Sequence, residues 1–264
     1  MRGFPLLFSL LCAAAAASAA PPTFQDTIAQ RALACTSCHG KEGRAGPDGY
    51  YPRIAGKPAG YLYNQLLHFR DGRRHYGLMA GLLDTLSDEY LYELAQYFAG
   101  LDLPYPPPQR SAQPAEVLQR GRQLSVQGDP QRGVPACASC HGTALTGVAP
   151  NVPGLLGLPR DYLNAQLGAW RTGQRRAAAP DCMAEIARRL SPEDLSAVTA
   201  FLAAEALPAN PHPVGADTRR AAGVSASSGN ARQRKAGRPQ PAASAAAPAV
   251  RCGYAQPPVA EAGR

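Results

Sequence analysis

The sequence has few of the features that mark membrane proteins, nucleic-acid-binding proteins or many enzymes. Its N-terminal apolar stretch is short for a membrane span. Between residues 20 and 208, 18 Lys and Arg stand against 17 Asp and Glu, so the net charge of +8 does not describe a basic surface there. Nucleic-acid binding therefore has no support in this part of the chain. No acid/base pair and no separate substrate domain can be recognised either.

The N-terminus has the pattern of an export signal. Arg2 supplies the positive charge, residues 4–11 the apolar core, and residues 17–19 a cleavage site of small side chains. We expect residues 1–19 to be a signal peptide that is removed, together with Cys12. A retained membrane anchor is the alternative.

Four of the seven cysteines belong to two copies of the pentapeptide Cys-x-x-Cys-His. Two thiols three positions apart on a helix can each form a thioether to one vinyl group of a haem, and the adjacent imidazole can then bind the iron. One copy alone could be a zinc site or a thioredoxin-like motif, but two copies within a longer repeat favour haem. The predicted attachment and ligand residues are Cys35, Cys38 and His39 in the first copy and Cys137, Cys140 and His141 in the second. The expected cofactors are two covalently bound haem c groups.

The repeat extends well beyond these motifs. Tyr61 and Gln65 recur 101 positions later as Tyr162 and Gln166, within a longer set of matched positions. The other matches include Leu62, Leu66, Arg70, Gly72, Pro52 and Gly56 with Leu163, Leu167, Arg171, Gly173, Pro153 and Gly157. Such self-similarity indicates a duplicated domain.

The resulting organisation is two small helical domains between a signal peptide and a low-complexity tail. We expect a signal peptide at 1–19, domains at 20–102 and 115–207, a Pro-rich extended linker at 103–114, and a basic low-complexity tail at 208–264 that is disordered. Helices are predicted after the capping residues Ser87 and Ser191 and over residues 60–70, 115–124 and 162–170. Each copy has only about 85 residues, so a haem must supply much of its buried surface. In the first copy, Pro47 or Pro52 could place a carbonyl against the ring of His39.

The sixth iron ligand decides whether such a protein carries electrons or binds small molecules. Apart from the first residue, the chain has two methionines, Met79 and Met183. They lie at equivalent places, 40 residues after His39 and 42 residues after His141. We expect Met79 to lie in a loop. A thioether ligand opposite histidine raises the reduction potential. Both methionines are therefore predicted iron ligands.

Other side chains compete for these roles. A methionine often only fills a core, and His68 and His75 are rival ligands in the first domain. In the second domain the rival is Cys182, whose thiolate would lower the potential. Cys182 and Cys252 remain after the haem cysteines are assigned, and we favour a disulfide between them over two unpaired thiols.

These motifs occur twice in the same order. Each copy has the haem pentapeptide, a Pro-rich loop, a helix with Tyr-Leu and Gln-Leu, the methionine, and a last helix that begins at Leu-Ser. The arrangement over about residues 23–206 resembles the dihaem class I cytochromes c of the cytochrome c4 type. The resemblance implies an all-α fold of two tandem cytochrome c domains that face each other. It also implies periplasmic electron transfer from a quinol-oxidising bc1-type complex or a dehydrogenase towards a terminal oxidase.

Two functional interpretations stay open at this point. The first is an electron carrier, because two six-coordinate haems leave no open iron for a substrate. The alternative is a dihaem enzyme or enzyme subunit. It would be thiosulfate dehydrogenase-like if Cys182 binds iron, or peroxidase-like if one iron has an open coordination position. The basic tail could associate weakly with an anionic membrane surface or an acidic partner, or could be only a solvated extension.

Overall fold

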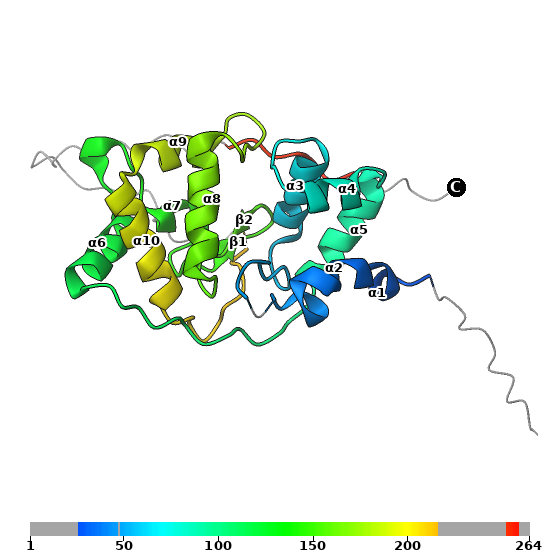
Figure 1. Cartoon of the computed structure of the whole chain (residues 1–264), viewed down its shortest axis with the longest axis horizontal. Coiled ribbons are helices and arrows are strands. Elements are labelled where there is room, and N and C mark those ends of the chain that lie inside the picture. Colours follow the sequence, from blue (N-terminus) through cyan, green and yellow to red (C-terminus); the bar gives the residue numbers. More distant parts are fainter. Residues whose placement is uncertain (1–25, 47, 216–251, 259–264) are drawn as a thin grey trace, which may run out of the picture.

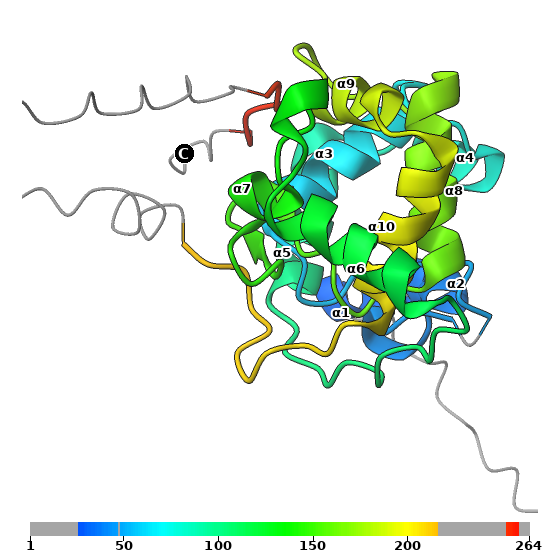
Figure 2. The same cartoon turned by 90° about the vertical axis from the view of Figure 1, so that its left-hand side faces the viewer.

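The computed structural model describes residues 26–46, 48–215 and 252–258. It consists of two groups of helices that lie side by side, α1–α5 and α6–α10 (Figure 1). We refer to these groups as the first and second domains. The view turned by 90° shows how the helices of the second domain surround its centre (Figure 2). No helix in the described residues is long and apolar enough to cross a membrane.

The first domain contains five α-helices and one 3-10 turn. Their bounds are α1 Ile28–Arg31, α2 Leu33–His39, η1 Lys41–Gly43, α3 Ala59–Arg70, α4 Gly77–Leu83 and α5 Asp88–Ala99. Their apolar faces form one core in which Leu62, Leu91 and Phe98 are buried. The short motif helix α2 is continuous with this core through Cys35, which packs against it.

The second domain repeats this plan and adds a small hairpin. Its elements are α6 Ala115–Val126, η2 Pro130–Arg132, α7 Cys137–His141, β1 Gly147–Val148, β2 Val152–Pro153, α8 Arg160–Thr172, α9 Cys182–Arg189 and α10 Pro192–Ala204. The antiparallel pair β1–β2 lies in the stretch between α7 and α8. The all-α expectation is confirmed, since two-residue strands are the only sheet in the described residues.

The last helix of each domain begins at the residue predicted from the sequence. The Ser87 hydroxyl accepts the Tyr90 N–H at the start of α5, and the Ser191 hydroxyl accepts the Asp194 N–H at the start of α10. Each cap satisfies one backbone donor that has no partner inside the helix. In both helices acidic residues follow in the first turn, where the helix dipole favours them.

Helices α6 and α10 cross at very short range in the second domain. A Cβ atom at Gly121 of α6 would overlap the Ala197 carbonyl oxygen and would lie 2.7 Å from the Phe201 Cβ. The backbones therefore touch at this crossing, which brings Leu124 and Phe201 into one core. Only glycine fits at position 121 because the contact is with backbone, which cannot rotate away.

The Pro-rich segment between the domains is held at both ends. Its residues form no helix or strand, as expected for a run of prolines. The buried guanidinium of Arg53 donates to the carbonyls of Leu103 and Pro104 and lies 4.0 Å from the centre of the Tyr105 ring. Further along, the Gln109 N–H donates to the Ala203 carbonyl of α10. The linker therefore follows the surface of both domains.

Two parts of the expected tail are attached to the folded body. Val214 pairs with Val148 of β1, and residues 252–258 contact both domains. The signal peptide expected at residues 1–19 lies outside the described residues, as do residues 216–251 and Pro47.

The helix crossing yields a first testable prediction. Replacing Gly121→Ala should lower the free energy of unfolding of the haem-loaded protein by about 1–3 kcal/mol, since α6 and α10 must move apart. The matched control is Gly168→Ala in α8, where a Cβ meets no atom within 4 Å. That substitution should be neutral or stabilising by about 0.5–1 kcal/mol. Thermal unfolding followed by circular dichroism measures both, and equal midpoints in the two variants would contradict the tight crossing.

Candidate functional site: two haem-binding helices and a shared arginine pair

Each haem motif forms a short helix that ends at its histidine. Cys35 and Cys38 lie three positions apart on α2, and Cys137 and Cys140 have the same spacing on α7, so each pair lies on one side of its helix. A glycine with positive φ follows each histidine, Gly40 (φ 74°) and Gly142 (φ 85°). A Cβ at Gly40 would overlap the Ala45 carbonyl oxygen, so the chain can turn after the motif helix only with glycine there.

The two histidine rings are oriented by the same backbone contact. The Nδ1 atom of His39 lies 2.8 Å from the Pro52 carbonyl oxygen, and the Nδ1 atom of His141 lies 2.7 Å from the Pro153 carbonyl oxygen. A carbonyl can only accept, so Nδ1 carries the proton and Nε2 is the nitrogen with a lone pair for a metal. The expectation for Pro52 is confirmed, and its repeat partner Pro153 acts in the same way.

The surroundings of these groups suit a covalent haem. Burial lowers the pKa of His39, which favours the neutral imidazole that metals bind. Burial raises the pKa of the Cys35 thiol to about 11, as expected for a thiol beside an apolar core. The four motif cysteines form no disulfide, although the same chain joins Cys182 to Cys252. Their sulfur atoms are therefore available for thioether bonds.

The two methionines lie in equivalent short helices that precede the last helix of each domain. Met79 lies within α4, so the expectation of a loop there is wrong: Gly77 to Leu83 forms nearly two helical turns, with Leu83 buried in the core. Met79 packs at the edge of the core that also includes Cys35. Met183 is half-buried in the first turn of α9. Ligation of iron by either methionine stays a prediction.

The structure assigns another role to two of the three rival ligands, Cys182 and His75. Cys182 is bonded to Cys252, which confirms the predicted disulfide and leaves no thiolate at this position. His75 is exposed, and its backbone N–H donates to the Gln174 carbonyl of the second domain. His68 is buried, and burial together with nearby arginines lowers its pKa to about 4.

A pair of arginines joins the domains, and sequence analysis missed it. Arg74 and Arg175 face each other in an antiparallel backbone bridge. The Arg74 guanidinium donates to Gln65 of its own domain and to Gln166 of the other, at 3.0 and 2.7 Å. Arg175 donates to the same two glutamines, both at 2.8 Å. The separation of 101 residues between the two arginines equals that of the repeat, and this signal could have revealed them.

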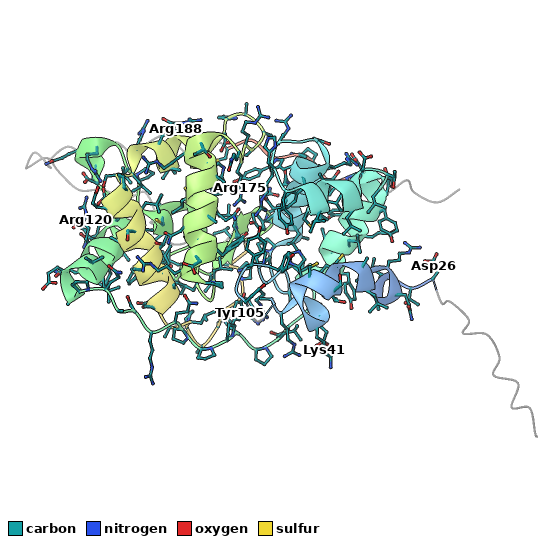
Figure 3. The ribbon with its side chains drawn as sticks, viewed as in Figure 1. Asp26, Lys41, Tyr105, Arg120, Arg175 and Arg188 are labelled. Carbon is teal, nitrogen blue, oxygen red and sulfur yellow. A yellow bond between two sulfur atoms is a disulfide. The ribbon has the colours of Figure 1, made fainter. Side chains whose placement is uncertain are left out.

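Tyrosine hydroxyls and two further aromatic rings contact the arginine pair in a symmetric way. Arg74 also donates to the Tyr162 hydroxyl and lies over the Phe69 ring, 4.4 Å from its centre. Arg175 correspondingly donates to the Tyr61 hydroxyl and lies 3.8 Å from the centre of the Trp170 ring. Figure 3 places Arg175 between the two groups of helices. Each arginine is thus bound by equivalent side chains from both copies of the domain.

The electrostatics of this interface call for an anion. Arg175 is only 4% exposed, and burial and the neighbouring Arg74 lower its pKa. Lys57, also buried, donates to the Gly154 carbonyl of the other domain, and burial lowers its pKa to about 8. Within the described residues no carboxylate forms an ion pair with any of these three cations. Buried charges without counter-charges are costly, and the two propionate groups of each haem c have the required sign. The residues present therefore fit the haem.

Comparison with known proteins agrees with this description. Residues 118–204 match the family model described as "Cytochrome c", and residues 20–98 match "Cytochrome C oxidase, cbb3-type, subunit III". The chain is 36% identical to the thiosulfate dehydrogenase electron acceptor of Thiomonas intermedia (strain K12), over 72% of this chain and 83% of that protein. It is 34% identical to cytochrome c4 of Pseudomonas aeruginosa, over 65% and 84% of the two chains.

Solved structures show the same relationship. Reduced recombinant cytochrome c4 from Pseudomonas stutzeri matches with a TM-score of 0.57 and 28% identity, over 66% of this chain and 94% of that one. Thiosulfate dehydrogenase from Marichromatium purpuratum matches with a TM-score of 0.56 and 32% identity. The match covers 66% of this chain but only 36% of that enzyme chain, so the chain spans about a third of its length.

With these relatives the duplicated motif helices have one interpretation, and the protein is a dihaem class I cytochrome c. The chain belongs to the cytochrome c4 family, as its motifs indicated. It carries two covalently bound haem c groups and transfers electrons.

The arginine pair leads to a second prediction. In the haem-loaded protein, Arg175→Gln should lower the free energy of unfolding by about 3 kcal/mol, because it would remove the cation that we expect to pair with a haem propionate. It should also lower the reduction potentials, since a nearby positive charge favours the more electron-rich iron. Thermal unfolding and a redox titration measure the two effects.

The control for this prediction is Arg176→Gln, whose side chain is exposed. It should change neither quantity, because solvent and salt screen an exposed charge. If Arg175→Gln instead stabilised the protein, the guanidinium would have no anionic partner, and its proposed fit to the haem would be wrong.

Proposed function

We propose that the protein is a periplasmic electron carrier that accepts electrons from a dehydrogenase acting on a reduced sulfur compound and passes them towards a terminal oxidase. A quinol-oxidising bc1-type complex is the second possible donor. The observation that carries the choice of donor is the similarity to electron acceptors of thiosulfate dehydrogenase from two organisms, at 36% identity in both cases. The export signal expected at residues 1–19 supports the location.

In this proposal each haem has a complete set of protein ligands. Cys35 and Cys38 hold the first haem and Cys137 and Cys140 the second. His39 with Met79, and His141 with Met183, bind the irons. The haem supplies one-electron chemistry, while the chain excludes water and fixes the ligands. The carbonyl contacts of the two histidines support their assignment, because each contact leaves Nε2 for the iron.

The alternative, an enzyme that itself oxidises thiosulfate or reduces peroxide, has less support. A cysteine-ligated iron would need the Cys182 sulfur, which is held in a disulfide. The similarity to the solved thiosulfate dehydrogenase covers about a third of that enzyme. We therefore propose that this chain corresponds to an electron-accepting part and not to a catalytic one.

The ligand assignment predicts a spectroscopic result. Met79→Ala and Met183→Ala should each remove half of the weak near-red absorption that arises from iron–methionine charge transfer. Each should also open one of the two reduced haems to carbon monoxide, which the unaltered protein should not bind. The control is Leu78→Ala, next to Met79 but 68% exposed, which should change neither property. A variant with full near-red absorption would exclude that methionine as a ligand.

A kinetic experiment tests the proposed donor. With a thiosulfate dehydrogenase and thiosulfate, the oxidised protein should become reduced at both haems, as followed by its visible spectrum. With thiosulfate and ferricyanide but no dehydrogenase, it should form no tetrathionate. Turnover in the second mixture would favour the enzyme, and failure of reduction in the first would exclude this dehydrogenase as the donor.

A further inference from the structure

The first domain holds its methionine helix with a cluster of three tyrosines, Tyr50, Tyr51 and Tyr76. Tyr76 directly precedes α4, and its hydroxyl lies 3.2 Å from the hydroxyl of Tyr51. The Tyr50 ring packs edge-on against both, with centroids 5.1 and 6.0 Å away. Tyr51 also packs edge-on against His39. The tyrosine cluster therefore connects one predicted iron ligand with the start of the helix that carries the other.

The second domain has no equivalent cluster. The residues 101 positions after the three tyrosines are Asn151, Val152 and Ala177, none of which is aromatic. Helix α9, which carries Met183, buries only two alanines. Two methyl groups remove little apolar surface from water, so packing alone holds this helix weakly.

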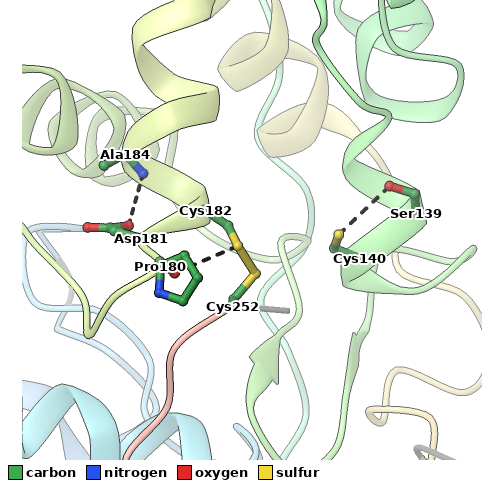
Figure 4. The surroundings of a disulfide bond; sticks show 7 residues. All are labelled: Ser139, Cys140, Pro180, Asp181, Cys182, Ala184 and Cys252. Atoms are coloured by element: carbon green, nitrogen blue, oxygen red, sulfur yellow. Dashed lines mark hydrogen bonds between the residues drawn. A yellow bond between two sulfur atoms is a disulfide. The ribbon is translucent and has the colours of Figure 1, made fainter. Parts of the chain in front are cut away.

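The start of α9 is capped by the Asp181 side chain and is also held by the C-terminal strap, which we define as residues 252–258. Cys252 is bonded to Cys182, the first residue of α9 and the neighbour of Met183 (Figure 4). The Gly253 N–H donates to the Pro180 carbonyl at 3.0 Å. A Cβ at Gly253 would overlap the Ala179 carbonyl oxygen, so the strap lies directly against the segment before the helix. The surroundings of the disulfide drawn in Figure 4 also contain Cys140 of the second haem motif.

The other end of the strap lies on the first domain. The Ala255 N–H donates to the side-chain oxygen of Asn64 at 2.8 Å, and Ala255 packs against the first core. Asn64 is only 3% exposed, and its amide group donates in turn to the Gly60 carbonyl within α3. In Figure 1 the strap, in red, runs from the second group of helices to α3. It lies beyond residue 204, where the match to the cytochrome c family model ends.

We propose that the C-terminal strap is a positioning element for Met183. It fixes the start of α9 through the disulfide and anchors it to the first domain through Asn64. In the second domain the strap thus holds the start of the methionine helix, as the tyrosine cluster does in the first domain. This inference rests on the proposed function, because it requires Met183 to be the iron ligand.

Ligand exchange at the two haems tests this role in one molecule. The main variant is Cys182→Ser with Cys252→Ser, and the probe is imidazole added to the oxidised protein. Imidazole should replace the methionine at the second haem about tenfold faster or more, since the cross-link no longer restrains α9. Exchange at the first haem should not change. The Met183→Ala variant identifies which spectral change belongs to the second haem.

A second readout follows the helices themselves. Hydrogen exchange of the backbone amides of residues 182–189 should become faster in the double-serine variant, while that of residues 77–83 stays the same. The reciprocal variant Tyr76→Phe removes the hydrogen bond to Tyr51. It should speed imidazole binding at the first haem only.

A variant whose chain ends at Gly253 distinguishes the contribution of the disulfide from that of the contact with Asn64. It keeps the disulfide but loses the contact with Asn64, so exchange at the second haem should rise by less than in the double-serine variant. Exchange equal to that of the full chain would overturn the anchoring on the first domain.

Two outcomes would overturn the positioning role. One is an unchanged rate at the second haem in the double-serine variant, and the other is an equal rise at both haems, which would mean general loosening. Failure of the ligand assignment is distinguishable, because Met183→Ala would then leave the near-red absorption intact. In that case unchanged hydrogen exchange in α9 would still refute the restraint of this helix by the strap.

Discussion

The pairing of two guanidinium groups where the domains meet, one of them buried, is the constraint on which the arrangement of the molecule depends. Arg74 and Arg175 are held by neutral glutamine and tyrosine groups, which satisfy hydrogen bonds but do not neutralise charge. Taking a charge out of water costs several kcal/mol unless an opposite charge accompanies it. Haem propionates would provide such charges, and domain association and haem attachment would then stabilise each other.

Gene duplication explains the form of this interface. An antiparallel bridge between equivalent residues is compatible with two-fold symmetry, and the backbone bonds on either side are also equivalent. The His75 N–H donates to the Gln174 carbonyl, and the Arg176 N–H donates to the Arg73 carbonyl. Two copies of one surface therefore bind each other, as in a symmetric dimer. Away from the arginine pair the two domains differ. Lys57 belongs to the first domain, and the disulfide holds the second. The two haems therefore have different surroundings and can have different reduction potentials.

The sequence predicts most of what depends on local chemistry. The haem cofactors, the helical fold and the Ser87 and Ser191 caps follow from short motifs, and so does the Cys182–Cys252 pairing once the haem cysteines are set aside. Features that depend on packing between distant segments could not be predicted. Nothing in residues 77–83 distinguishes a loop from a short helix, because Gly77 and Gly81 weaken the helical pattern. The contact of Ala255 with Asn64 joins residues 191 positions apart, and no sequence pattern predicts it.

The same interface also suits the movement of electrons between two fixed sites. A change of charge at one haem reorients any dipoles that are free to turn, and this reorganisation slows electron transfer. Arg175 is buried and hydrogen-bonded to glutamines of both domains, and its guanidinium lies over the Trp170 ring, so little can turn. Preorganised polar groups of this kind stabilise charge without rearrangement. The bonds that join the domains through the arginine pair thus also hold the polar groups between the domains in place.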